Sequence, residues 1–353
     1  MPVLTDDVRI DTLKPLLPPA ILMDEIPLGE AESQAIAESR RQVAEIIEGK
    51  DDRLLVVVGP CSIHDPQAGL EYARRLQALA PKLTGDLQIV MRTYFEKPRT
   101  TVGWKGLIND PKLDGSFAIN QGLRVARTFL RDVVELGLPT GLEFLDPITP
   151  QFMADLVTWG AIGARTTESQ VHRELASGLS MPVGFKNGTG GTVQIAADAV
   201  RSAAEPHHFL SVTKQGLAAI VATRGNPHCH VILRGGANGP NYGEEAVGAA
   251  VAMLEKNKLP SRLMIDTSHA NSGKDPARQP EVAAAIARQV AAGNRAIFGV
   301  MLESFLVAGR QEIGERSQMT FGQSVTDGCL AWDSTVPVLE GLAEAVRARR
   351  ARA

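Results

Sequence analysis

The stretch Leu54-Leu55-Val56-Val57-Val58-Gly59-Pro60-Cys61-Ser62 is a continuous apolar run that ends in a turn and a thiol. Runs of this kind are typical of parallel strands that are buried on both faces of a sheet. Similar runs recur between helical patterns at residues 87–92, 140–145, 161–164, 183–186, 230–235, 262–266 and 296–302. Eight strand–helix units favour a closed (β/α)8 barrel over an open sheet.

A doubly wound sheet is the competing architecture for alternating strands and helices. Such sheets commonly carry a Gly-x-Gly-x-x-Gly fingerprint after the first strand, where they bind a dinucleotide. In this chain Gly59-Pro60-Cys61-Ser62 stands at that point, and the fingerprint is missing. The expected fold is therefore an α/β protein of the TIM-barrel type.

Two segments do not belong to the eight repeated units. Residues 1–50 contain several prolines before a helical pattern near residues 30–48, which indicates an N-terminal arm followed by a helix. Two apolar runs flank Lys214-Gln215-Gly216-Leu217, which predicts a β-hairpin inserted near residues 208–224. We expect the catalytic barrel to span residues 51–353 and both additions to serve regulation or assembly.

Composition excludes several classes of protein. The chain has 353 residues, is 44% apolar and carries a formal net charge of -3, so no overall positive field favours nucleic acid or a membrane surface. No apolar segment approaches the length of a membrane span, and the first 17 residues lack the apolar run of a signal peptide. Three scattered cysteines suit a reducing compartment, so we expect a cytoplasmic protein.

Ionisable side chains stand at the end of nearly every predicted strand. In a (β/α)8 barrel these strand ends converge on one mouth, where active sites lie. Like charges gathered at one mouth are costly unless an anionic ligand neutralises them, and arginine suits phosphate or carboxylate groups. The sequence therefore predicts an anion site lined by five cations, namely Arg92, Lys97, Arg165, Lys186 and Arg234.

A second group at the same strand ends combines sulfur, nitrogen and oxygen donors: Cys61, His269, Glu303 and Asp327. Such a mixed set suits a divalent transition-metal ion. No Cys-x-x-Cys or His-Glu-x-x-His spacing supports the assignment, however. A buried cysteine that packs as a small apolar residue and a hydrogen-bonded structural histidine explain two of these residues equally well. The residues alone leave the metal site open.

Several long strings of the sequence resemble one known family, the type I 3-deoxy-D-arabino-heptulosonate 7-phosphate (DAHP) synthases, first enzymes of the shikimate pathway. The resemblance covers nearly the whole chain and its motifs are highly specific. They are Gly-Pro-Cys-Ser-Ile-His-Asp at 59–65, Tyr-Phe-Glu-Lys-Pro-Arg-Thr at 94–100, Gly-Trp-Lys-Gly at 103–106, Gly-Ala-Ile-Gly-Ala-Arg-Thr-Thr-Glu-Ser at 160–169, Gly-Phe-Lys-Asn-Gly-Thr at 184–189 and Leu-Arg-Gly-Gly at 233–236.

The resemblance implies an aldol-like condensation of phosphoenolpyruvate with erythrose 4-phosphate that releases inorganic phosphate. It implies that Cys61, His269, Glu303 and Asp327 hold a divalent metal, which could be manganese, iron, cobalt or zinc. It places around phosphoenolpyruvate the residues Arg92, Lys97, Glu143, Ala164, Arg165, Lys186 and Arg234, and around the sugar phosphate Lys97, Pro98, Arg99 and Thr100. Lys97 and Glu143 are alternative holders of the water that attacks C2, and with Cys61 and His269 they form the expected catalytic set.

Family members of this type are commonly inhibited by an aromatic amino acid. The resemblance implies a cavity formed by Asp146, Gln151, Leu175, Leu179, Phe209, Ser211 and Val221, with Asp6 and Asp7 supplied by the N-terminal arm of a second copy. Ser211 favours phenylalanine as the inhibitor, because tyrosine-sensitive relatives tend to carry glycine there. The same resemblance suggests a homodimer or homotetramer.

Two other functions remain as alternatives. A sister synthase that uses arabinose 5-phosphate shares the barrel and many of the cations, but it generally lacks the Lys97-Pro98-Arg99-Thr100 string, the arm and the hairpin. A catalytically silent subunit that senses aromatic amino acids would not need every expected metal ligand and phosphate-facing cation. The intact set therefore favours the synthase over both alternatives.

Overall fold

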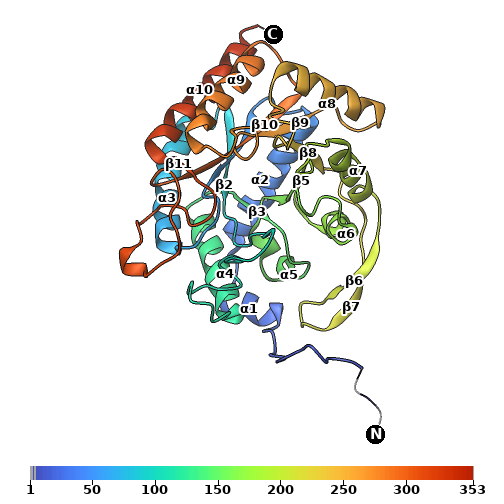
Figure 1. The fold of residues 1–353 in the computed structure, drawn as a ribbon. Helices are drawn as coiled ribbons and strands as arrows, with labels where there is room; N and C mark the ends of the chain where they lie inside the picture. Colours follow the sequence, from blue (N-terminus) through green and yellow to red (C-terminus); the bar gives the residue numbers. More distant parts are fainter. Residues whose placement is uncertain (1–2, 4, 353) are drawn as a thin grey trace.

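The computed structural model describes residue 3 and residues 5–352 of the chain. Eight parallel strands form a closed barrel in the order β1-β2-β3-β4-β5-β8-β9-β10, and the pairing of β1 with β10 closes it (Figure 1). The expected (β/α)8 fold is confirmed. The strands are β1 (Leu54–Gly59), β2 (Leu87–Arg92), β3 (Thr140–Glu143), β4 (Trp159–Ile162), β5 (Val183–Lys186), β8 (His230–Leu233), β9 (Leu263–Asp266) and β10 (Ile297–Phe305).

Helices surround the barrel on its outer face (Figure 1). They are α3 (Pro66–Leu79), α4 (Ile119–Glu135), α5 (Thr149–Met153), α6 (Gln170–Gly178), α7 (Gln194–Ala203), α8 (Glu244–Lys256), α9 (Gln279–Ala291) and α10 (Trp332–Arg350). Helix α4 shows why they form, because Leu123, Ala126, Leu130 and Val133 recur at helical spacing and are buried. Each helix thus covers the sheet with one apolar face.

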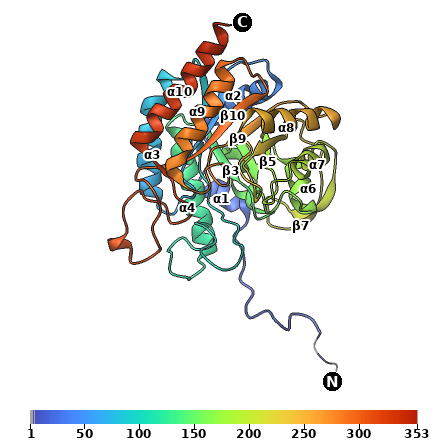
Figure 2. The same ribbon diagram turned by 45° about the horizontal axis from the view of Figure 1, so that its top comes forward.

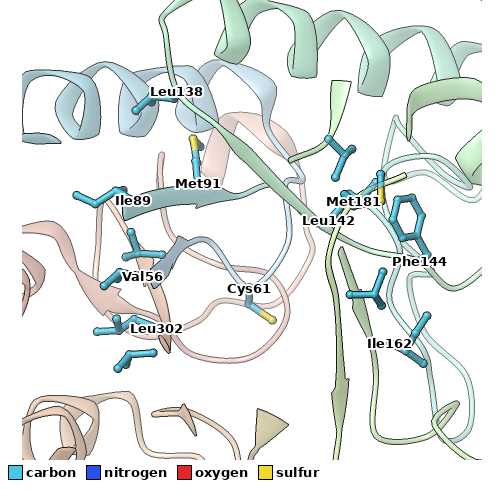
Figure 3. Close-up of a cluster of buried hydrophobic side chains, with 14 of the residues drawn as sticks. Val56, Cys61, Ile89, Met91, Leu138, Leu142, Phe144, Ile162, Met181 and Leu302 are labelled. Carbon is cyan, nitrogen blue, oxygen red and sulfur yellow. The ribbon is translucent and has the colours of Figure 1, made fainter. Parts of the chain in front are cut away.

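The interior of the barrel and its outer layer are filled by alternate residues of the same strands. Val56 and Val58 belong to the large cluster between the sheet and the helices, part of which Figure 3 shows around Val56, Ile89 and Met91. Leu55 and Val57 point the other way and belong to a smaller cluster inside the barrel. Both sides of each strand are therefore buried, as the continuous apolar runs predict.

The fourth strand lies two residues earlier than the sequence predicts, at Trp159–Ile162 instead of 161–164. The carbonyl of Gly163 accepts hydrogen bonds from the N–H groups of Thr166 and Thr167, at 3.0 Å each, so a turn has begun at this point. Apolar character continues through Ala164 although the strand does not. The last strand is longer than the predicted 296–302. β10 continues to Phe305, because Ser304 and Phe305 pair with the short strand β11 (Leu330–Ala331).

Helix α2 (Glu30–Glu48) closes the end of the barrel that lies opposite the mouth. Its residues Val43, Ile46 and Ile47 are buried in the same cluster as the barrel interior, and Figure 1 shows α2 across the centre of the barrel. The part of the N-terminal extension that follows the arm is therefore built into the core. Because α2 covers this end, the mouth is the open end of the barrel.

The inserted hairpin consists of β6 (His208–Val212) and β7 (Ala218–Ala222), which form an antiparallel sheet of their own. A short helix, α1 (Pro19–Glu25), lies next to it, since the N–H of Ala20 donates to the carbonyl of Lys214 at 2.7 Å. Before α1 the chain extends away from the barrel in both views (Figures 1 and 2). Within the described residues, no helix is long and apolar enough to cross a membrane.

Candidate active site

The expected site residues gather at the carboxyl ends of the strands. Arg92, Glu143 and Lys186 are the last residues of β2, β3 and β5, and Arg234 directly follows β8. Neighbouring strands in register place these ends at one mouth. The position of the site thus follows from the barrel rather than from any local motif.

Three of the four expected metal ligands lie together. One donor atom each of Cys61, Glu303 and Asp327 lies within 4.8 Å of the others, which is close enough for one ion to contact all three. Cys61 and Glu303 are buried, whereas Asp327 is exposed. Since a thiol and two carboxylates are donors that divalent transition metals accept, the residues present fit such an ion.

The loop that carries Asp327 is held against the end of β1 by two buried contacts. The hydroxyls of Ser62 and Thr326 are hydrogen-bonded at 2.8 Å. The N–H of Cys61 donates to the Sγ of Cys329 at 3.3 Å. All three cysteines are buried free thiols. These contacts fix two of the proposed ligands relative to each other although they are more than 260 residues apart in sequence.

His269, the fourth expected ligand, lies at the edge of this group. Its Nε2 is 4.0 Å from Oε1 of Glu303, and its Nδ1 is 2.9 Å from Oδ2 of Asp266. The residue has a positive φ of 55°, which is uncommon for a side chain of this size. Asp266 therefore orients the ring with one nitrogen, and the other faces the donor group.

Glu303 is held as a carboxylate by its neighbours. Arg92 donates to its Oε1 at 2.9 Å, and the Ser268 hydroxyl donates to its Oε2 at 2.8 Å. Burial alone would raise its pKa, but His269 and Arg92 outweigh it and lower the pKa to about 2. The group is thus ionised at neutral pH, as metal binding requires.

Lys97 lies beside Cys61. Its Nζ is 3.0 Å from the Sγ of Cys61 and 3.3 Å from the carbonyl oxygen of the same residue. Burial and the nearby Glu303 raise the pKa of the Cys61 thiol, and the charge of Lys97 opposes this effect. Lys97 therefore places a cation directly beside the thiol-carboxylate group.

The remaining cations differ in burial and in their partners. Lys186 is buried, 3.2 Å from Asp266 and 4.0 Å from Glu143. Arg234 is also buried, and its Nε has no hydrogen-bond partner among the described residues. Arg165 is exposed and Ala164 is half-buried. Buried Arg234 thus offers an unused donor, and Arg165 lies at the rim.

Part of the positive charge of the five cations is compensated within the protein itself. Two carboxylates inside the mouth pair with them, since Glu303 contacts Arg92 and Asp266 contacts Lys186. Asp266 was not among the expected site residues, although it stands at the end of a strand as the others do. Its position at the end of β9 was the signal that could have identified it.

The expected sugar-phosphate residues lie on the long loop between β2 and α4. Pro98 is half-buried, and Arg99 and Thr100 are exposed. This loop folds back on itself, because the N–H of Lys97 donates to the carbonyl of Lys105 at 2.9 Å. At Gly106, with φ +115°, a Cβ atom would lie 1.9 Å from the Phe95 carbonyl oxygen. Only glycine fits here, which explains the end of the Gly-Trp-Lys-Gly motif.

Glu96, which sequence reasoning did not single out, connects this loop with the segment that follows β3. Its side chain accepts hydrogen bonds from the N–H groups of Asp146, at 3.1 Å, and Leu145, at 3.4 Å. Burial and the nearby Asp146 raise the pKa of Glu96 to about 8. Its place directly before Lys97, inside a long motif, was the one signal available in the sequence.

The expected inhibitor residues fall into two places. Leu175 and Leu179 lie in and just after α6, which contacts β6. In the hairpin, Phe209 is paired with Val221, and Ser211 lies on the same half-buried face. Asp146 is exposed and Gln151 lies in α5. Asp6 and Asp7 are exposed in the extended arm, which in this single chain points away from the barrel.

The raised pKa of Glu96 makes the free energy of unfolding depend on pH. The folded state binds the proton more tightly than the unfolded state, whose pKa is near the ordinary 4.5. The resulting stabilisation is complete below pH 4.5 and is lost as pH rises through 8. From pH 6 to pH 8.5 we expect the wild-type protein to lose about 1–2 kcal/mol of unfolding free energy through this group. Glu96→Gln cannot titrate and should not show this loss. Urea unfolding at both pH values checks this, and an unchanged pH dependence in the variant would refute it.

Known proteins are similar to this chain over nearly its whole length. The DAHP synthetase I family matches residues 27–340. The Phe-sensitive phospho-2-dehydro-3-deoxyheptonate aldolase of Escherichia coli is 57% identical, with 98% of each chain covered. The tyrosine-inhibited enzyme of that name from Schizosaccharomyces pombe is 54% identical, with 98% of this chain and 94% of the other covered. The solved structure of the phospho-2-dehydro-3-deoxyheptonate aldolase of Francisella tularensis has 56% sequence identity to this chain. It superimposes with a TM-score of 0.95 and covers 97% of this chain and 100% of its own. The chain therefore belongs to the DAHP synthetase I family.

Proposed function

We propose that this protein is a metal-dependent DAHP synthase, which condenses phosphoenolpyruvate with erythrose 4-phosphate. The observation that carries the proposal is one mouth in which a thiol-carboxylate donor group lies directly beside the buried Arg92 and the half-buried Lys97. Family membership over nearly the whole chain supports the same reaction. C3 of phosphoenolpyruvate forms a bond to the aldehyde carbon, water adds at C2, and the C2–O bond to phosphate breaks.

Phosphoenolpyruvate carries a carboxylate and a phosphate, so its site needs several fixed cations. Lys186 and Arg234 are buried at neighbouring strand ends, and Arg234 keeps an unpartnered Nε. Arg165 at the rim and Arg92 at the floor complete the proposed ring, with Ala164 beside Arg165. Asp266 and Glu303 already balance part of this charge, which reduces repulsion among the cations when no ligand is bound. The positive charge that remains still attracts an anion.

The sugar phosphate is assigned to the loop between β2 and α4. Pro98 stiffens the segment, and Arg99 and Thr100 present a guanidinium and a hydroxyl to solvent at its surface. Arg99 is held in place because its Nε donates to the carbonyl of Trp104 at 2.7 Å. The phosphate would thus bind outside the mouth while the aldehyde reaches inward toward Lys97.

Cys61, Glu303, Asp327 and His269 are the residues that would hold the divalent ion. When bound, such an ion polarises the aldehyde oxygen and stabilises the negative charge that develops there. Lys97 lies 3.0 Å from Cys61, so its ammonium can donate a proton at the same side of the mouth. Glu143, next to Lys186, is the other group that can orient the water that attacks C2.

Both alternative functions predict different behaviour. A sister synthase would turn over arabinose 5-phosphate faster than erythrose 4-phosphate. A silent sensor would bind an aromatic amino acid without turnover. The loop that contains Arg99 and Thr100 and the complete set of donors favour the DAHP synthase over both.

The test is phosphate release from phosphoenolpyruvate plus erythrose 4-phosphate. We expect turnover that a chelator abolishes and a divalent metal restores. Cys61→Ala removes a ligand and should reduce kcat at least about 100-fold. Cys229→Ala is the matched control, since Cys229 is also a buried free thiol but is not part of the donor group.

Turnover that is unaffected by chelator and by Cys61→Ala would refute the metal assignment. A preference for arabinose 5-phosphate would instead identify the sister activity. No turnover after metal reconstitution, with an aromatic amino acid still bound, would identify the silent sensor.

We also propose feedback inhibition by phenylalanine, bound where α6 contacts the hairpin. Ser211 lies on the same half-buried hairpin face as Phe209 and Val221, and its side chain would leave less room for a phenol hydroxyl than glycine would. In the same assay we expect phenylalanine to inhibit more strongly than tyrosine, and Ser211→Gly to improve tyrosine inhibition by about tenfold or less. Equal or stronger inhibition of the wild-type enzyme by tyrosine would contradict this proposal.

A homodimer or homotetramer is proposed from the surface of the hairpin. Leu210 is 85% exposed and Ile220 is 77% exposed, and the two lie opposite each other in the hairpin. Large exposed apolar side chains in register are typical of contact surfaces. Association through this face would also bring Asp6 and Asp7 of one copy near the hairpin of another.

A further inference from the structure

A cavity is lined by three loops that follow barrel strands and by α4. It has a volume of about 620 Å³, within the range of sites that bind small molecules. Its lining residues come from segments 64–67, 107–113 and 316–321, together with α4. None of the residues assigned above to the metal, the substrates or the inhibitor lines it.

One part of the cavity wall is apolar. Leu107 is almost completely buried, and Leu113, Val125 and Met319 are partly buried against the main core. Phe321 adds an aromatic ring that is 52% exposed. Such a wall favours the apolar body of an organic molecule over a small inorganic ion.

The charged side chains of the cavity favour an anion. Lys112 and Arg316 are exposed cations from two different loops. Asp65 is the single carboxylate among the lining residues, and its Oδ1 accepts hydrogen bonds from the N–H groups of Gln67 and Ala68 at the start of α3. This carboxylate is therefore partly neutralised, and the positive charges dominate the opening.

His64 provides a buried polar contact. The residue is only 4% exposed, and its Nδ1 has no hydrogen-bond partner among the described residues. Burial lowers its pKa to about 4, so the ring is neutral at neutral pH. A buried polar atom that lacks a partner is unfavourable, and a ligand atom would remove this cost.

We propose that this cavity binds a small organic acid with one carboxylate and an apolar ring. The carboxylate would contact Lys112 and Arg316, and the ring would lie on Leu107, Leu113 and Val125. The apolar wall would hold the apolar body of the ligand, and the two cations favour a ligand with a negative charge. A neutral or cationic ligand would fit this combination less well.

A bound acid would also connect the three loops that form the active site. His64 lies three residues after Cys61, and Leu107 is on the same loop as Lys97. Arg316 is on the loop that carries Asp327, and its Nη2 already donates to the carbonyl of Pro111 at 2.8 Å. A ligand between these segments would hold together the residues that we assign to the metal and the sugar phosphate.

Hydrogen exchange of the full-length protein, followed by mass spectrometry, tests the site with trans-cinnamate as the probe. We expect slower exchange in segments 61–68, 105–114 and 315–321 with cinnamate. The uncharged trans-cinnamamide at equal concentration should have little effect. Protection centred on the hairpin at residues 208–222 would show that the acid occupies the proposed inhibitor cavity instead, and would overturn the inference, as would the absence of any protection.

Two variants and one control identify the contacts. Lys112→Gln and Arg316→Gln should each raise the Kd for cinnamate about tenfold, measured by calorimetry. Arg310→Gln is the control, because Arg310 is an exposed arginine on the same loop that does not line the cavity. Arg316→Gln would also remove the hydrogen bond to the Pro111 carbonyl and could disturb the loop. The Lys112 variant does not remove this bond, so it tests the ligand contact separately. Unchanged affinity in both variants would refute the site, whether or not the protein is a synthase.

Discussion

The pairing of β1 with β10 is the constraint on which the rest of the structure depends. It closes the barrel, and its register places Gly59 opposite Glu303. Cys61 follows two residues later, so the thiol and the carboxylate meet at one point of the mouth. A slip of one residue would turn Glu303 toward the helices, because side chains alternate along a strand. The donor group is therefore a consequence of how the barrel closes.

Buried charge is the second organising feature, and it is compensated within the protein. An isolated ion in the interior would cost several kcal/mol, roughly, even after relaxation. Arg92 with Glu303 and Lys186 with Asp266 avoid this cost by direct contact. The unpartnered Nε of Arg234 and the exposed Arg165 then remain for an anionic ligand. Such a preorganised site needs little rearrangement when charge develops during a reaction.

The barrel could be predicted from the sequence because apolar runs and strand ends repeat regularly. The positions of Cys61, Glu303 and Lys186 at the mouth followed from that repeat. Asp266 and Glu96 were missed, because their roles depend on side-chain contacts across strands and loops that no local spacing reveals. The end of β4 was misplaced because apolar character continues past Ile162, whereas the turn that begins at Gly163 ends the strand.

A crystal grown with manganese and phosphoenolpyruvate tests the central claim most directly, through the anomalous scattering of the metal. The structure predicts one strong peak at bonding distance from Cys61 Sγ and the carboxylates of Glu303 and Asp327, with His269 Nε2 turned toward it. It also predicts phosphoenolpyruvate between Arg165, Lys186 and Arg234. A peak away from the thiol, or phosphoenolpyruvate bound outside the mouth, would contradict the account.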